Sequence, residues 1–321
     1  MLPYSHSVSN KVKLEKVLDP NVATFSSIRH LPSTMDNPVL EIQLANDILI
    51  QKVNDQISLG TFDNSDRQLM LKLVEGLGDP RGLVRLRFAE TIGEIGEPAT
   101  TFLTEALAND QNVVLRRAAA KTLTIIADPK AVPTLINSFL NDPDTVVRSS
   151  AAGALARTGE ASVTALLEIL ESPDRPQDTK GHAAWALAFI GSEAAEYLYQ
   201  ALNSESLDVR CAVIGALGHV AQERSDEKSC SILVSALTDP EAIIRTEAAA
   251  ALGQVDYPAA IPHLILALQD SDLDVRKAAI NSLGKIGNSN VLETLQPLLN
   301  DDQEVVRVLA KLAIAQINRQ S

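Results

Sequence analysis

Apolar residues recur three and four positions apart through most of the chain, and this pattern itself repeats. In segments such as AVPTLINSFL (residues 131–140), the spacing is that of one buried helical face. A short polar turn follows each such segment, and then a second helical pattern that begins at a basic residue. These basic anchors are Arg85, Arg116, Arg148, Lys180, Arg210, Arg245, Arg276 and Arg307, spaced 30 to 35 residues apart. The period predicts helix-turn-helix units that bury their apolar faces by stacking.

Polar residues at the unit boundaries predict where the helices start and stop. An aspartate stands six residues before most anchors, at Asp79, Asp110, Asp142, Asp239, Asp270 and Asp301. We expect it to cap the second helix by accepting free amide hydrogens. Several second helices run into a glycine, a common helix stop: Gly96, Gly159, Gly191 and Gly287. We expect each basic anchor to pair with an acidic residue of the turn and so to orient the stack.

These patterns predict an all-α chain, a right-handed α-solenoid of about eight short helix-turn-helix repeats over residues 66–321. An amphipathic segment, PVLEIQLANDILIQKVNDQ (residues 38–56), predicts an extra helix, so residues 37–65 are interpreted as a capping helix and linker. Residues 1–36 are rich in Ser and Pro without a clear period, and we interpret them as a loose N-terminal extension.

Aligned second helices separate a core face from a variable face. Counted from the anchor, positions +3, +7 and +10 are apolar and predict the core, whereas +2, +5 and +9 change chemistry from copy to copy. We expect that variable stripe to form the inner surface of the solenoid. In the fourth unit it carries Trp185 and Phe189, with Gly153 and Gly215 at the equivalent positions next door. Large aromatics beside missing side chains predict a slot.

Charged and polar residues of the same stripe surround the predicted slot. His182 and His219 bracket it, and Arg157 and Lys121 supply positive charge. An aromatic floor with cationic rims suits a flat conjugated ligand that bears carboxylates, or a protruding loop of a partner protein. The alternative interpretation is that Trp185 fills a packing gap between units. Large aromatics on a surface are typical interface anchors, which favours the binding site.

Composition narrows the classes of function. The net charge of −13 disfavours nucleic acid and anionic membranes as partners. No run of about 18 apolar residues exists, so no membrane-spanning helix is expected, and the start lacks the apolar core of a secretory signal. The two cysteines, Cys211 and Cys230, indicate reduced, buried thiols, and no spacing predicts a metal site. Without a nucleophile, phosphate-binding or zinc motif, the chain is predicted to be a binding protein.

The repeats resemble a known family. The units DPDTVVRSSAAGALARTGE (142–160) and DSDLDVRKAAINSLGKIGN (270–288) are similar to the short HEAT-like repeats named after the phycobilin lyases of cyanobacteria. The stretches GLVRLRFAETIGEIG, RRAAAKTLTIIADPKAVPTLIN and TKGHAAWALAFIG resemble the branch associated with phycobilisome degradation. The resemblance covers roughly residues 66–319. It implies a phycobiliprotein-binding factor that handles the bilin chromophore, by detachment or transfer, during degradation or remodelling of phycobilisomes.

The same resemblance implies partners and a location. The partners would be phycobiliprotein subunits and an open-chain tetrapyrrole such as phycocyanobilin, bound as a ligand and not as an intrinsic cofactor. The location would be cytoplasmic, peripheral to thylakoid-attached phycobilisomes. The best-known lyases of the family work as two different chains, whereas this chain carries eight units, so lyase activity stays open. His182 and His219 are the candidates for a general acid or base. A non-enzymatic HEAT-repeat adaptor, and assembly work on another tetrapyrrole or cofactor system, are the alternatives.

Overall fold

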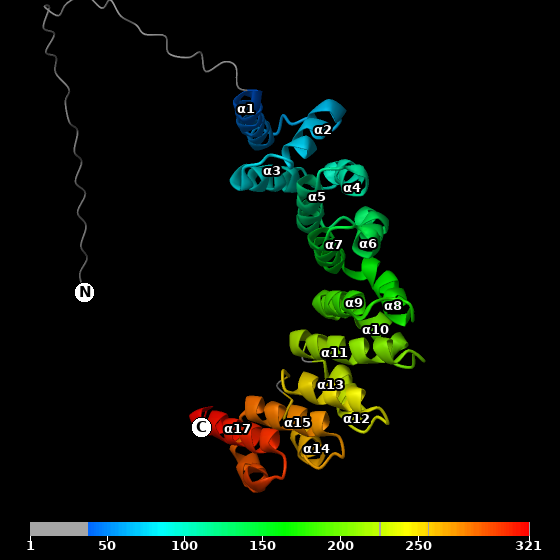
Figure 1. Ribbon diagram of the computed structural model, residues 1–321, viewed down its shortest axis with the longest axis vertical. Helices are drawn as coiled ribbons and strands as arrows, with labels where there is room; N and C mark the ends of the chain where they lie inside the picture. Colours follow the sequence, from blue (N-terminus) through cyan, green and yellow to red (C-terminus); the bar gives the residue numbers. More distant parts are fainter. Residues whose placement is uncertain (1–37, 225, 256, 321) are drawn as a thin grey trace, which may run out of the picture. The chain divides into compact units, whose positions relative to one another are not determined.

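The computed structural model describes residues 38–224, 226–255 and 257–320, and every regular element in these ranges is a helix (Figure 1). Helix α1 spans Pro38–Ser58. Eight helix pairs follow: α2 Arg67–Gly76 and α3 Gly82–Ile95, α4 Thr100–Asn109 and α5 Val113–Ile126, α6 Val132–Asn141 and α7 Thr145–Arg157, α8 Val163–Glu171 and α9 Gln177–Ile190, α10 Ala195–Ala201 and α11 Leu207–Arg224, α12 Glu227–Ala236 and α13 Ala242–Leu252, α14 Ile261–Ala267 and α15 Leu273–Ile286, and α16 Leu292–Leu295 and α17 Glu304–Gln320. The expected all-α solenoid is confirmed.

Contacts divide the chain into two compact units, residues 1–44 and 45–321. The first is described only over the opening turns of α1, and the predicted extension over residues 1–36 lies outside the described residues. Within the second unit, Ile50 and Val53 of α1 are buried, and Asn54 accepts a hydrogen bond from Thr91 of α3. This half of α1 therefore packs against the first repeat.

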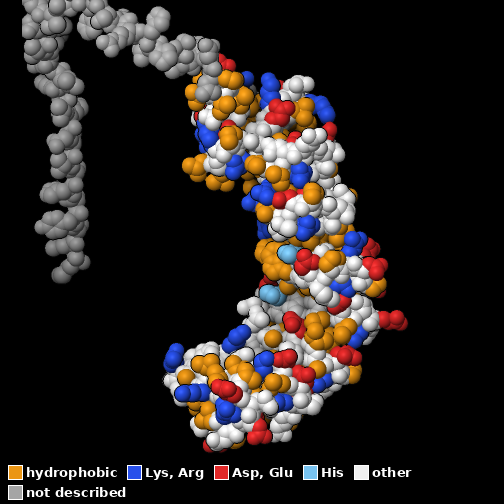
Figure 2. All heavy atoms as spheres, in the orientation of Figure 1, with side chains coloured by type: hydrophobic (Ala, Val, Ile, Leu, Met, Phe, Trp, Pro, Cys, Tyr) orange, Lys and Arg blue, Asp and Glu red, His pale blue; other side chains and the backbone are white. Residues whose placement is uncertain are grey.

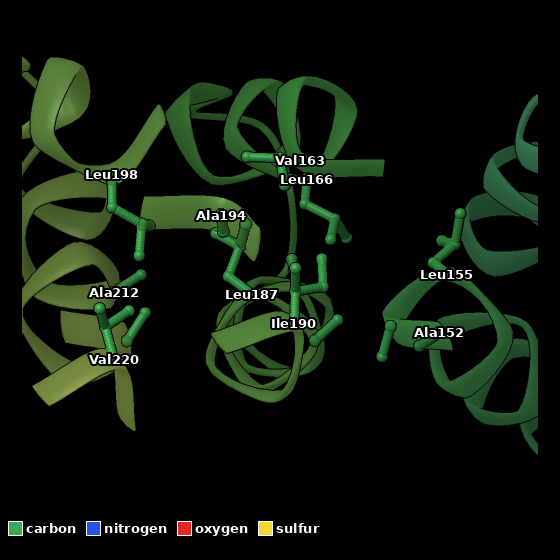
Figure 3. Close-up of a cluster of buried hydrophobic side chains, with 14 of the residues drawn as sticks. Ala152, Leu155, Val163, Leu166, Leu187, Ile190, Ala194, Leu198, Ala212 and Val220 are labelled. Atoms are coloured by element: carbon green, nitrogen blue, oxygen red, sulfur yellow. The ribbon is translucent and has the colours of Figure 1, made fainter. Parts of the chain in front are cut away.

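The repeats stack through their second helices. Each of α3, α5, α7, α9, α11, α13 and α15 packs against the second helix of the next pair, and each first helix covers the second helix of its own pair. The predicted core position +7 is fully buried at Leu123, Leu155, Leu187, Leu217, Leu252 and Leu283. Figure 3 shows Leu155 and Leu187 within a cluster to which Leu166 and Leu198 of the first helices contribute. In the last repeat, Ile314 is only partly buried, because no described helix packs on the outer side of α17.

Small residues at position +8 let the second helices approach closely. A Cβ added at Gly253 would lie 2.8 Å from the Cα of Ser282 on α15, and one at Gly284 would lie 3.0 Å from the Cα of Ala313 on α17. Carbon atoms in ordinary contact are about 3.5–4.0 Å apart, so neither site has room for a side chain. These glycines set the distance between successive repeats.

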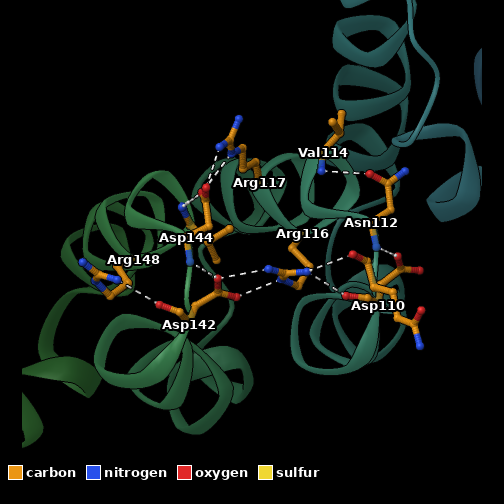
Figure 4. Close-up of polar contacts among 10 residues, drawn as sticks. Asp110, Asn112, Val114, Arg116, Arg117, Asp142, Asp144 and Arg148 are labelled. Carbon is orange, nitrogen blue, oxygen red and sulfur yellow. Dashed lines mark hydrogen bonds and ion pairs between the residues drawn. The ribbon is translucent and has the colours of Figure 1, made fainter.

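Each arginine anchor donates to a carbonyl oxygen of its own turn, and Arg116 and Arg245 also reach the next repeat, as Figure 4 shows for Arg116. Arg116 donates from Nη1 to the carbonyl oxygen of Asp110, 3.0 Å away, and from Nε and Nη2 to the carboxylate of Asp142 in the following repeat, at 2.9 and 3.2 Å. Arg245 makes the same paired contact with Asp270. For these two anchors the expected acidic partner thus comes from the neighbouring turn, while the anchor's own turn supplies a carbonyl oxygen. This geometry joins repeats and does not merely close a turn.

The turn aspartates do not cap the second helices, which corrects the expectation from sequence. Oδ1 of Asp142 accepts from the backbone amide of Asp144, 2.8 Å away, and Asp144 is the residue that caps α7 through the amide of Val147. The aspartate six residues before the anchor lies too early to reach the free amides of the helix. It shapes the turn and leaves its carboxylate available to the preceding repeat.

The first of these turn aspartates gives a test of stability against pH. Asp79 is 3% exposed and accepts hydrogen bonds from Arg81, at 3.0 and 3.1 Å, and from Asn46, at 2.9 Å. The hydrogen bond from Arg81 is the largest cause that lowers the pKa of Asp79, from 3.8 to about 2. A carboxyl with a lowered folded pKa stabilises the fold above its ordinary pKa and loses that contribution as the pH falls through the folded value.

We therefore expect Asp79→Asn to lower the free energy of unfolding by about 2 kcal/mol at neutral pH. The difference from wild type should shrink as the pH falls below about 4 and should disappear only below pH 2, where the aspartate is protonated in both the folded and the unfolded state. Denaturant unfolding of wild type and Asp79→Asn at several pH values measures this difference in the free energy of unfolding. A difference that is the same at neutral and at acidic pH would show that the carboxylate's charge contributes nothing.

Candidate functional site

Helix α9 presents two large aromatic side chains to solvent. Trp185 is 52% and Phe189 50% exposed, and their ring centroids lie 5.6 Å apart at an angle of 35°. They stand one helical turn apart, whereas Ala186 and Leu187 between them face the core. Trp185 therefore does not fill a gap in the packing, and the alternative interpretation from sequence is wrong. An apolar aromatic pair on the surface is the kind of feature that marks a binding site.

Trp185 forms one wall of a groove between α9, α11 and α13, with a volume of about 410 Å³. We call this the central groove. Small residues, among them Ala184, Ala188 and Gly215, line its floor. Its polar lining residues are Gln177, Lys180, Asp208, Cys211, His219, Glu247 and Gln254. Figure 2 shows hydrophobic and histidine side chains side by side on the central repeats.

Gly153 and Gly215 occupy the position of Trp185 in the two neighbouring repeats, and their surroundings differ. A Cβ added at Gly153 would meet nothing within 4 Å, so that side is open. A Cβ added at Gly215 would lie 2.7 Å from Oε1 of Glu247. The space that the glycine leaves next to Trp185 is therefore shared with the carboxyl group of Glu247, which reaches across from α13.

The two predicted histidines lie on different sides of Trp185. His219 is exposed and lines the central groove. His182 lines a second, open hollow with Ser149, Asp178 and Trp185, and its Nδ1 lies 2.7 Å from the carbonyl oxygen of Asp178. Its ring also contacts Phe139 edge-on, with centroids 6.4 Å apart. The structure thus places only His219 in the groove, and His182 lines the other hollow beside Trp185.

The predicted cations do not line the central groove. Lys121 lines a third hollow, of about 420 Å³, with Leu86 and Ile125 on α3 and α5. Arg157, the last residue of α7, is exposed and is not among the lining residues of either hollow next to Trp185. The cation within the groove is Lys180, which forms an ion pair with Asp208. The expected cationic rim is therefore absent from this groove, because Lys121 and Arg157 lie on α5 and α7, whereas the groove is formed by α9, α11 and α13.

The HEAT repeats family model matches residues 70–156, 163–252 and 230–315, and the PBS lyase HEAT-like repeat model matches residues 147–172. The bilin biosynthesis protein MpeU of Synechococcus sp. (strain WH8020) is 40% identical over 239 residues, which are 74% of this chain and 80% of that protein. The chain belongs to the HEAT-repeat family of the phycobilin lyase type.

This HEAT-repeat protein is also similar to other members of the larger repeat group. Deoxyhypusine hydroxylase of Candida albicans (strain SC5314 / ATCC MYA-2876) is 29% identical over 301 residues, 90% of this chain and 92% of that protein. The structure of the complex of CpcE and CpcF of phycocyanin lyase from Nostoc sp. PCC7120 aligns with a TM-score of 0.42 and 23% identity, over 48% of this chain and 98% of that chain.

The thiols of this HEAT-repeat protein are not poised for nucleophilic chemistry. Cys211 lines the central groove, and burial, with the carboxylates of Glu247 and Asp208, raises its pKa to about 11. Cys230 is buried, and burial raises its pKa too. Both are free cysteines. Because the thiolate is the reactive form, Cys211 stays largely protonated and unreactive at neutral pH.

No group of three or more His, Cys, Asp or Glu side chains among the described residues could hold a metal ion. No helix among residues 38–320, as far as they are described, is long and apolar enough to cross a membrane.

Sequence reasoning missed Glu247 as a site residue. It occupies position +2 of the sixth repeat, where a charged residue is expected to be solvated. Nothing in the sequence around Glu247 indicates that it lines the same groove as Trp185, two repeats earlier. The one sequence feature that hints at this position is Gly215, on the helix between them. Its missing side chain leaves room for the long side chain of Glu247 from the next repeat.

Proposed function

We propose that this HEAT-repeat protein binds an open-chain tetrapyrrole in the central groove and handles that bilin for a phycobiliprotein. The observation that carries the proposal is the half-exposed Trp185 at the wall of the groove, in a chain 40% identical to a bilin biosynthesis protein. Ligand sites are typically concave and apolar, with a few polar groups that fix orientation, and the central groove has this character.

The shape of the groove supports a flat conjugated ligand. The indole of Trp185 provides a rigid planar wall, and the small residues Ala184, Ala188 and Gly215 leave a shallow floor. Stacking of a conjugated system on an aromatic ring adds to the free energy of area burial. His219 and Gln254, which also line the groove, can donate hydrogen bonds to carbonyl oxygens of the ligand.

We further propose transfer of the bilin to a phycobiliprotein as the main role. The printed name of the relative, a bilin biosynthesis protein, supports transfer. The resemblance of three segments to the degradation branch supports detachment during phycobilisome breakdown or remodelling as the second form of the same activity. Either role calls for binding and orientation of the bilin against a cysteine of the partner, which by itself accelerates a reaction between bound groups.

A second candidate function is a protein adaptor, which the hollow around Lys121 favours. Leu86 and Ile125 are each 52% exposed there, and Lys121 is exposed beside them. Arg117 lines the same hollow, although it already pairs with Asp144. An apolar patch with a cationic edge suits an acidic, partly apolar surface of a partner protein. This hollow could seat the phycobiliprotein while the bilin occupies the central groove.

A titration tests the proposal. The purified protein is mixed with phycocyanobilin, and separately with apo- and holo-phycocyanin, while the visible absorbance and co-elution are followed. A shifted bilin spectrum, together with co-elution, supports bilin handling. Co-elution with the phycobiliprotein and an unchanged bilin spectrum would establish the adaptor instead. If the spectrum does not shift and no co-elution occurs, both proposed functions are contradicted.

A further inference from the structure

Glu247 is an acid without a partner in the central groove. The structure shows no hydrogen bond from a described residue to its carboxyl group, and burial alone raises its pKa. The group lies over Gly215, 2.7 Å from the position a Cβ would take there. An unpaired, half-buried carboxyl lowers stability, because ionisation in a desolvated place is unfavourable. Such groups are frequent where a ligand supplies the missing partner.

The charges around Glu247 leave the groove without a free cation. From α9, Lys180 faces the groove but forms an ion pair with Asp208 of α11. The other titratable lining residues from α11 are Cys211, whose raised pKa keeps it neutral, and His219. Helices α12 and α15 also pack on α13 but contribute no residue to this groove. The groove therefore does not attract carboxylates and instead suits groups that donate hydrogen bonds or carry positive charge.

An open-chain tetrapyrrole carries both kinds of group on its conjugated part. Its pyrrole N–H groups are donors, and protonation of the basic ring nitrogen adds a further N–H and a delocalised positive charge. A carboxylate that accepts from such N–H groups forms a charge-assisted hydrogen bond, which is roughly twice as strong as a neutral one. The face of an indole also attracts a cation. Glu247 and Trp185 therefore favour the same protonation state of the ligand.

We infer that the central groove binds the tetrapyrrole as its protonated, cationic form, with Glu247 accepting hydrogen bonds from the ring nitrogens opposite Trp185. The inference rests on the proposed function, because it names the form of the ligand and a binding residue for the same site. The ligand's propionates then point out of the groove, away from Glu247 and Asp208. Affinity should fall as the pH rises and the ring nitrogen loses its proton.

The test compares wild type with Glu247→Gln in a titration with phycocyanobilin at neutral pH. Free phycocyanobilin in acid and in neutral solution gives the reference spectra of the protonated and neutral forms. We expect wild type to bind with the spectrum of the protonated form. Glu247→Gln should bind about tenfold or more weakly, with the spectrum of the neutral form, since the amide cannot balance a positive charge.

The matched control is Glu241→Gln, which removes one negative charge beside the same helix but outside the groove. It should leave both the affinity and the spectrum unchanged. The thermal midpoint of Glu247→Gln should equal or exceed that of wild type, so a folding defect cannot imitate the result. Binding of the neutral form by wild type, or an unaltered spectrum in Glu247→Gln, overturns the inference and leaves the proposed function standing. Absence of any bilin binding by wild type overturns both.

Discussion

Trp185→Ala is expected to weaken binding of phycocyanobilin by about 30-fold or more, because hot-spot aromatics contribute at least about 2 kcal/mol. The indole forms a wall of the central groove and half of its surface is free to stack on a ligand. Absorbance titration measures the affinity. Trp185→Phe serves as the matched control and should keep most of the affinity, since a smaller planar ring remains.

The same substitution should change the stability little. A side chain that is 52% exposed loses only part of its contacts with the protein when it is removed. Retained affinity in Trp185→Ala would show that the bilin binds elsewhere, for example in the hollow around Lys121. Loss of affinity in both Trp185 variants, with a normal thermal midpoint, would indicate that the indole N–H and not the aromatic plane is recognised.

Leu187→Ala should behave in the opposite way. Leu187 lies two residues after Trp185 on α9 but is fully buried among Leu155, Leu166 and Leu198 (Figure 3). Removal of a buried leucine side chain leaves a cavity, and we expect the free energy of unfolding to fall by about 2–5 kcal/mol. Denaturant unfolding measures this. A loss below about 1 kcal/mol would mean that neighbouring repeats close over the cavity.

Trp185→Ala and Leu187→Ala, both on α9, distinguish an effect on bilin binding from an effect on folding. At low temperature, where Leu187→Ala remains folded, its affinity for the bilin should stay close to that of wild type. The central groove is built from three successive second helices, so a loosened core next to it affects the site only when the stack opens. A protein of this repeat type gains stability from each interface between neighbouring units, and one weak interface can open locally.

The proposed bilin site depends on how the repeats differ from one another. The core positions, such as Leu155 and Leu187, repeat because every interface must bury a similar apolar face. The exposed positions of the second helices do not contribute to that interface and can change from one repeat to the next. Trp185 is therefore an addition to the fourth repeat that the fold tolerates without loss of packing. Glu247 is a similar addition in the sixth repeat, and the helix between them brings the two to one groove.

The sequence by itself determined the helices, their order and the core face. Position +7 is buried from Leu123 to Leu283 as the pattern predicts, because helical periodicity is a local property and the same apolar spacing recurs in every repeat. The glycine stops also follow from the sequence, since Gly96, Gly159, Gly191 and Gly287 all adopt positive φ, which other residues rarely do. The half-exposed aromatic pair on α9 was predictable for the same reason.

Only the tertiary structure decided which exposed residues meet. It placed His182 and His219 in different hollows, kept Lys121 and Arg157 out of the central groove, and brought in Glu247 from two repeats away. It also moved the partner of Arg116 to the next turn. Such contacts depend on the offset between successive helices and on which neighbour lacks a side chain, as at Gly215. The repeat period gives the spacing of the helices along the sequence. The distance and rotation between successive helices arise from side-chain packing across their interface.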